Sequence, residues 1–79
     1  MAQVLGENVR RIRRERGMTL ETLAHEVGLA YSYMGQLERG QRNPTLDVVE
    51  RIAAVLKVEP LDLLTSDTRP LVRRSDHTK

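Results

Sequence analysis

The sequence predicts an all-α fold, a bundle of five helices, on three observations. Apolar residues recur at helical spacing in five segments, and no segment shows the strict alternation of a half-buried strand. Threonine, proline or glycine stands at most of the boundaries between segments, where helices begin or end. The chain has 79 residues, enough for one small domain.

The first two helices are separated by a short turn. The first is expected over about residues 3–16, on an apolar stripe of Leu5, Val9, Ile12 and Arg16. Gly17 can end this helix in the left-handed conformation. Thr19 is a good N-cap for a second helix over 20–27, and Gly28 follows the end of that helix.

The other three helices follow the same rules. A third helix is expected over 31–39, before the loop "GQRNP". Thr45 caps a fourth, "LDVVERIAAVL", whose apolar face is wide. Pro60 suits the first turn of a short fifth helix, "PLDLL".

Two regions differ in composition. Residues 1–64 carry the helical pattern, whereas residues 65–79 are polar and charged, and we expect a flexible C-terminal tail there. Residues 1–64 hold nine basic and nine acidic residues, so the net charge of +2 comes from four basic and two acidic residues in the tail. The balanced charge of 1–64 does not by itself indicate nucleic acid. Its one marked feature is a cluster formed by Arg10, Arg11, Arg13, Arg14 and Arg16.

Several functional classes are disfavoured. There is no cysteine for a disulfide or a thiolate metal site, which fits a cytoplasmic location. No apolar run approaches the roughly 20 residues of a membrane span. "HEVGL" lacks the second histidine of a zinc-protease motif, and "SDH" at 75–77 lies in the tail, which cannot preorganise a nucleophile. We therefore expect no enzyme activity, no metal and no cofactor.

The third helix has an unusual surface. No charged residue occurs from Val27 to Leu37, and the outward positions of the helical wheel are expected to be Ser32, Gly35, Gln36 and Arg39. Short polar groups can meet base edges in the DNA major groove, where acidic chains would be repelled by phosphates. About three residues separate the second and third helices, the turn length of a DNA-binding helix-turn-helix.

The whole of residues 5–64 resembles the Cro/repressor-type helix-turn-helix family, also called the xenobiotic-response-element (XRE) family. The resemblance rests on "RRIRRERGMT", "LAHEVGL", "QLERGQRNPTL" and "IAAVLKV" taken together. It implies a five-helix bundle of the repressor-like type that dimerises on double-stranded DNA, with its third helix in the major groove. The function so implied is sequence-specific transcriptional regulation at near-palindromic operators.

Residue roles also follow from the resemblance. The base-reading positions it implies are Tyr31, Ser32, Gly35 and Gln36. Gln41, Arg42 and Asn43 match a loop that usually binds phosphates. Arg39, the cation at the far end of the outward face of the third helix, is also predicted to bind phosphate. Arg13 and Glu38 match a structural ion pair between the first and third helices.

This chain departs from the family pattern at four positions, one of which is Thr22, where a glutamate usually completes the capping box with Thr19. Ala30 stands where a capping Ser, Thr or Asp is usual, and it cannot accept the capping hydrogen bond. Leu20 replaces a glutamine that often contacts phosphate. Lys57 replaces the glycine that commonly follows the fourth helix.

Two further interactions are expected. A homodimer interface is predicted at the fifth helix and the end of the fourth, around Val58, Leu61 and Leu64. The alternative to a regulator is a protein-binding module with secondary DNA binding, such as an antitoxin, in which the tail binds a protein partner.

Overall fold

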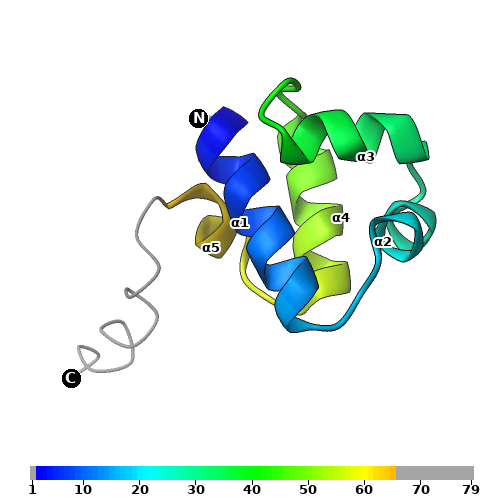
Figure 1. Ribbon diagram of the computed structural model, residues 1–79. Coiled ribbons are helices and arrows are strands. Elements are labelled where there is room, and N and C mark those ends of the chain that lie inside the picture. Colours follow the sequence, from blue (N-terminus) through cyan, green and yellow to red (C-terminus); the bar gives the residue numbers. More distant parts are fainter. Residues whose placement is uncertain (1, 66–79) are drawn as a thin grey trace.

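This computed structural model describes residues 2–65, which contain five α-helices and no strand (Figure 1). They are α1 (Ala2–Glu15), α2 (Leu20–Val27), α3 (Tyr31–Glu38), α4 (Leu46–Leu56) and α5 (Pro60–Leu64). The predicted all-α class is confirmed, and each helix ends within one residue of its expected position. The predicted tail lies outside the described residues, apart from Thr65.

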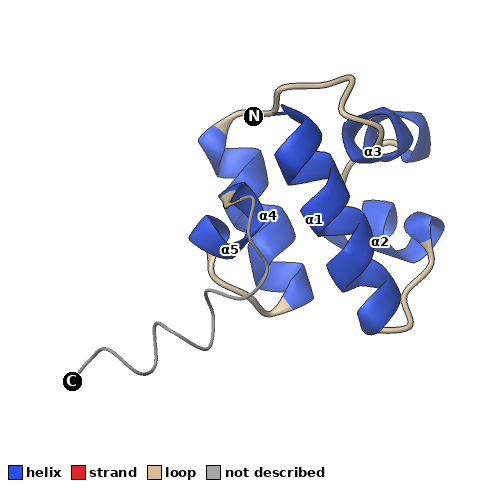
Figure 2. Ribbon diagram, turned by 60° about the vertical axis from the view of Figure 1, so that its left-hand side comes forward, coloured by secondary structure: helices blue, strands red, loops and turns tan. Residues whose placement is uncertain are grey.

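The helices surround one core. In both views α1 and α4 lie side by side at the centre, with α2 and α3 on one side and α5 on the other (Figures 1 and 2). All five helices contribute to the core, which consists of Leu5, Val9, Ile12, Leu23, Ala24, Val27, Met34, Leu37, Val49, Ile52, Ala53, Leu56 and Leu63. No described helix is long and apolar enough to cross a bilayer.

The backbone of α1 lies directly against that of α3 at Gly6. A Cβ atom at this position would lie 2.7 Å from the backbone oxygen of Glu38 and would also meet the backbone oxygen of Leu37. Glycine inside a helix costs about 1 kcal/mol relative to alanine. Its use here lets the backbones of α1 and α3 pack directly against each other.

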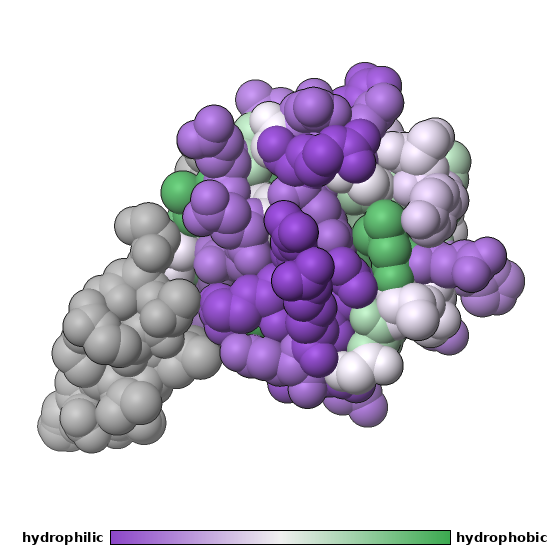
Figure 3. All heavy atoms as spheres, viewed as in Figure 1, coloured by the Kyte–Doolittle hydropathy of each residue, from purple (hydrophilic) through white to green (hydrophobic). Residues whose placement is uncertain are grey.

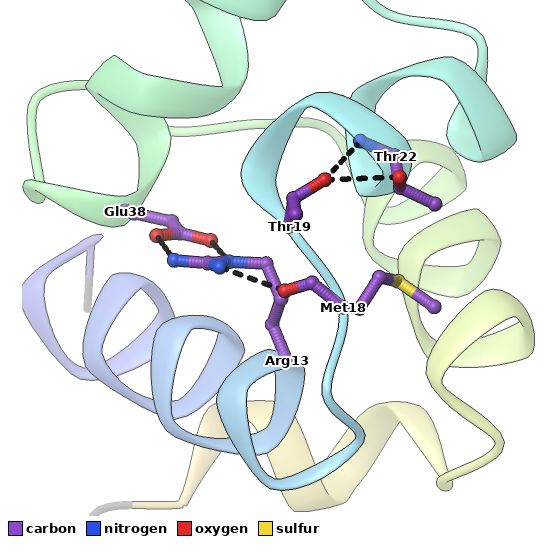
Figure 4. Close-up of polar contacts among 5 residues, drawn as sticks. All are labelled: Arg13, Met18, Thr19, Thr22 and Glu38. Atoms are coloured by element: carbon purple, nitrogen blue, oxygen red, sulfur yellow. Dashed lines mark hydrogen bonds and ion pairs between the residues drawn. The ribbon is translucent and has the colours of Figure 1, made fainter.

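A buried ion pair joins the same two helices (Figure 4). Arg13 donates from Nε to Glu38 Oε2 at 2.7 Å and from Nη2 to Oε1 at 3.0 Å, so the pair is bidentate. The two side chains are only 11% and 6% exposed. Arg13 Nη1 also donates to the backbone oxygen of Met18 at 2.9 Å, so one guanidinium joins α1, α3 and the segment before α2.

Helix ends follow the expected capping chemistry. Thr19 Oγ1 accepts from the backbone nitrogen of Thr22 at 3.0 Å, and Thr45 Oγ1 accepts from that of Val48 at 3.3 Å. Ala30 provides no side-chain cap to α3. Lys57 ends α4 in the left-handed region, with φ of 63°.

Two arginines stabilise the C-terminal ends of other helices through backbone oxygens. Arg16 Nε donates to Leu56 O at the end of α4, and Arg51 Nη2 donates to Val27 O at the end of α2, each at 2.8 Å. A cation there also interacts favourably with the helix dipole. Arg16 was expected on the apolar stripe of the first helix, and this was wrong, because α1 ends at Glu15 and Arg16 is exposed.

Asn8 connects α5 to α1. Its side chain is buried, and Nδ2 donates to the backbone oxygens of Leu63 at 2.9 Å and Thr65 at 2.7 Å. Residue 8 lies between Leu5 and Val9 on the inward face of α1, so this amide secures the end of α5 from within.

We predict that Arg13→Ala lowers the free energy of unfolding by about 3 kcal/mol, because Glu38 would keep a buried charge without its partner. The measurement is urea-induced unfolding followed by circular dichroism. Glu15→Gln is the matched control, since it removes the Arg11–Glu15 pair, whose side chains are 38% and 55% exposed. The control should change stability by less than about 1 kcal/mol, and equal effects of the two substitutions would contradict a structural role for Arg13.

A second prediction concerns the end of α4. Lys57→Gly should be more stable than Lys57→Ala by about 1 kcal/mol, because only glycine adopts the left-handed conformation without a Cβ penalty. Both substitutions remove the same charge, so the difference between their unfolding free energies reports the cost of holding a residue with a Cβ atom at positive φ. Equal stabilities would show that residue 57 is not held at positive φ in solution.

Candidate nucleic-acid interface

The outer face of α3 carries the candidate interface. A turn of three residues, 28–30, separates α2 from α3, and Gly28 makes it in the left-handed conformation, with φ of 85°. Tyr31 and Ser32 are exposed at the start of α3, Gln36 is half-buried at its middle, and Arg39 is exposed just after its end. Met34 and Leu37, on the opposite side, are fully buried and fix which face of α3 remains outside.

Gly35 was expected on this outer face, and the structure corrects that expectation. The residue is buried, because the side chains of Leu20 and Arg39 cover it. A Cβ atom at this position would lie 3.7 Å from Leu20 Cδ2 and 3.3 Å from Arg39 Nη1. The first residue of α2 thus covers this side of α3. The absence of a side chain at position 35 leaves room for the guanidinium of Arg39 beside the helix.

Gln36 is oriented by Arg42 from the loop after α3. Arg42 Nε donates to Gln36 Oε1 at 2.7 Å. A guanidinium has only donors, so the amide atom that faces it must be the oxygen. The Gln36 amide nitrogen is consequently left to donate to something other than Arg42.

Tyr33 supports the same loop arginine. The Cζ atom of Arg42 lies 5.4 Å from the centre of the Tyr33 ring, a cation–π arrangement. Arg42 is therefore held by a ring on one face and by an amide at Nε. Within residues 2–65 its Nη1 and Nη2 have no hydrogen-bond partner and are available to an anion.

The loop residues that were predicted to bind phosphate lie together between α3 and α4. Gln41, Arg42 and Asn43 are all exposed in the loop that connects α3 to α4. The contact between Arg42 and Gln36 therefore makes the loop and the outer face of α3 one continuous surface.

The predicted dimer residues lie away from this surface. Leu61 on α5 is 59% exposed, whereas Val58 and Leu64 are half-buried. α5 and α3 occupy opposite sides of the central helices (Figure 2). A partner at α5 would therefore leave the outer face of α3 uncovered.

Residues 9–63 match the helix-turn-helix family HTH_3. The chain is 37% identical over 75 residues to y4dJ, an uncharacterised HTH-type transcriptional regulator of Sinorhizobium fredii, covering 94% of this chain and 97% of the relative.

Two solved structures are also similar. The restriction–modification controller protein C.AhdI from Aeromonas hydrophila superposes with a TM-score of 0.75 at 40% identity, over 78% of this chain and 94% of its own. The biofilm master regulator SinR, solved in complex with DNA, gives 0.74 at 35% identity, over 77% of this chain and 98% of its own. SinR is an HTH-type transcriptional regulator of Bacillus subtilis.

Proposed function

The chain belongs to the helix-turn-helix family HTH_3 (XRE/Cro-like), and we propose that it regulates transcription by binding near-palindromic operators as a homodimer, with α3 in the major groove. It is a DNA-binding transcriptional regulator and not an enzyme. We assign DNA binding and dimerisation to residues 1–64.

The observation that carries this proposal is the outer face of α3. It presents short polar side chains and the donor of the Gln36 amide, next to a loop whose Arg42 has two guanidinium nitrogens without a partner among residues 2–65. A protein solved on DNA, SinR, has the same fold and 35% identity, which supports the same mode of binding here. The helix-turn-helix arrangement places such a face against base edges in the major groove.

We assign base reading to Tyr31, Ser32 and Gln36. Gln36 Oε1 has a second lone pair, so it can accept from adenine N6 while it still binds Arg42, and Nε2 can donate to adenine N7. Phosphate contacts are assigned to Arg39, Gln41, Arg42 and Asn43. Gly35 leaves the base-reading set, because Leu20 and Arg39 cover it.

A two-fold dimer through α5 completes the proposal. Val58, Leu61 and Leu64 form its apolar centre, and Leu61 is the most exposed of the three. A symmetric dimer would place two α3 helices about 34 Å apart, one turn of DNA, and would read an inverted repeat.

Selection of bound sites from random duplex DNA by the purified protein tests the proposal. It should recover two half-sites in inverted orientation with centres one helical turn apart. Recovery of no enriched sequence, with binding that depends on salt alone, would overturn sequence-specific regulation.

Substitution of Gln36 should affect sequence-specific binding but not non-specific binding to DNA. Gln36→Ala is expected to cost about 1–3 kcal/mol on the selected site and to flatten the preference at one base pair in each half-site. Its affinity for random DNA should stay unchanged because no charge is removed. Fluorescence anisotropy on the site and on single-base variants measures both quantities. Full preference at every base pair would show that Gln36 contacts only water.

Arg42 should behave differently, because it combines a charge with an orienting contact. Arg42→Ala is expected to weaken binding to every duplex and to lower the salt slope by about one for each protomer, or about two for the dimer. Because it also releases the Gln36 amide, its effect and that of Gln36→Ala should be less than additive on the selected site. Strict additivity in the double variant would contradict the coupling between the two side chains.

The dimer interface is tested with a matched pair of exposed leucines. Leu61→Glu should convert the dimer to a monomer in sedimentation equilibrium at micromolar concentration and should weaken operator binding. Leu46→Glu is the control, since Leu46 is 62% exposed but lies at the start of α4. A wild-type protein that stays monomeric both free and on the operator would exclude this dimer.

A further inference from the structure

A hollow of about 280 Å³ lies beside α3, on the flank opposite the Arg42 loop. Arg10, Arg13 and Arg14 of α1 line one wall, Leu20 of α2 another, and Gly35, Glu38 and Arg39 the third. In the space-filling view, strongly hydrophilic side chains gather over α1 and reach toward α3 (Figure 3). We call this hollow the arginine groove.

The arginine groove carries uncompensated positive charge. Its only acidic wall residue, Glu38, already forms the bidentate pair with Arg13. Arg10, Arg14 and Arg39 are exposed, and their side chains form no ion pair or hydrogen bond with any other residue of 2–65. Arg10 and Arg14 stand four positions apart on α1, where like charges are neighbours and repel. Three free guanidinium groups around one hollow suit an oxyanion.

The position of the groove identifies the anion. Residues on a helix turn by about 100° each, so Tyr33 and Arg39 lie about 60° to either side of Gln36. Arg42 packs on the Tyr33 side, whereas the arginine groove opens on the Arg39 side. A helix in the major groove, about 12 Å wide, has a row of phosphates along each flank. One flank of α3 therefore has Arg42 for its phosphates, and the other has the arginine groove.

We propose that Arg10, Arg14 and Arg39 form a phosphate-binding site that holds the DNA backbone on the α1–α2 side of α3. This inference rests on the proposed function, since it requires α3 to lie in the major groove. The side chain of Leu20 lines the groove and has no hydrogen-bond donor, so the arginines are the side chains that supply contacts to phosphate oxygens. Glu7 lines an adjoining hollow with Arg10 and Arg39, and its negative charge opposes the binding of an anion.

The decisive measurement is the salt dependence of DNA binding. Arg10→Gln and Arg14→Gln should each weaken binding to the selected operator and to random DNA about five- to tenfold at 0.1 M salt. Each should lower the salt slope by about one for each protomer, or about two for the dimer. Glu7→Gln should strengthen binding to both duplexes. Lys57→Gln is the charge-matched control, because residue 57 ends α4, outside the residues that line the groove, and it should leave the slope unchanged.

A single-phosphate probe tests contact directly. Operators in which one phosphate at a time is replaced by an uncharged methylphosphonate should reveal positions that weaken the wild-type protein but not the Arg10→Gln/Arg14→Gln double variant. These positions should lie on the backbone that flanks the half-site on the side opposite those sensitive to Arg42→Ala. If no position loses its effect in the double variant, the assignment is wrong.

The alternative ligand for the arginine groove is free phosphate, and a separate experiment tests whether it binds there. Inorganic phosphate is titrated into the protein at constant ionic strength while the arginine Nε–H resonances are followed by NMR. Saturable binding together with unchanged DNA affinity in Arg10→Gln and Arg14→Gln would overturn the backbone assignment in favour of a small phosphate ligand. Retained sensitivity to Gln36→Ala with no effect of either arginine substitution would refute this inference alone, whereas absence of any DNA binding would refute the proposed function.

Discussion

The contact between Arg13 and Glu38 is the interaction on which the rest of the interface depends. α3 has only eight residues and no side-chain N-cap at Ala30, and an isolated helix of that length is not stable in water. Its position is set by two buried residues beneath it and by the bidentate ion pair that attaches its last turn to α1. Because the same guanidinium also binds Met18 O, one side chain fixes α3 relative to both of the helices that it packs against.

A buried ion pair is weak evidence for net stability, since both charges lose hydration when the chain folds. Its value here lies in geometry and in charge. Glu38 must meet Arg13 in one register, and Gly6 permits the close backbone approach that this register requires. The pair also commits the only carboxylate in the wall of the arginine groove, so that Arg10 and Arg14 keep their charge for a ligand.

The helices were predictable from the sequence because their boundaries are local events: threonine caps at 19 and 45, and a left-handed glycine at 28. The contact of Arg13 with Glu38 was reached only through the family resemblance. Contacts between distant segments were missed, as the Asn8 tether to α5 illustrates, although a polar residue inside an apolar stripe is a signal for such a contact. The exposure of Gly35 was mispredicted because a helical wheel cannot show that Leu20 of another helix covers it.

Preorganisation explains why Arg42 touches two residues of α3 before any ligand arrives. A long, unrestrained arginine loses much rotamer freedom when it binds, and that loss opposes association. The Tyr33 ring and the Gln36 amide already restrict the Arg42 side chain in the folded protein, so less freedom remains to be lost. The Tyr33 ring covers one face of the Arg42 guanidinium and the Gln36 oxygen binds its Nε. Nη1 and Nη2 therefore stay available to a phosphate. The residue proposed to hold the backbone thereby also sets the orientation of the amide proposed to read the base, and a wrong base that displaces Gln36 would weaken the phosphate contact as well.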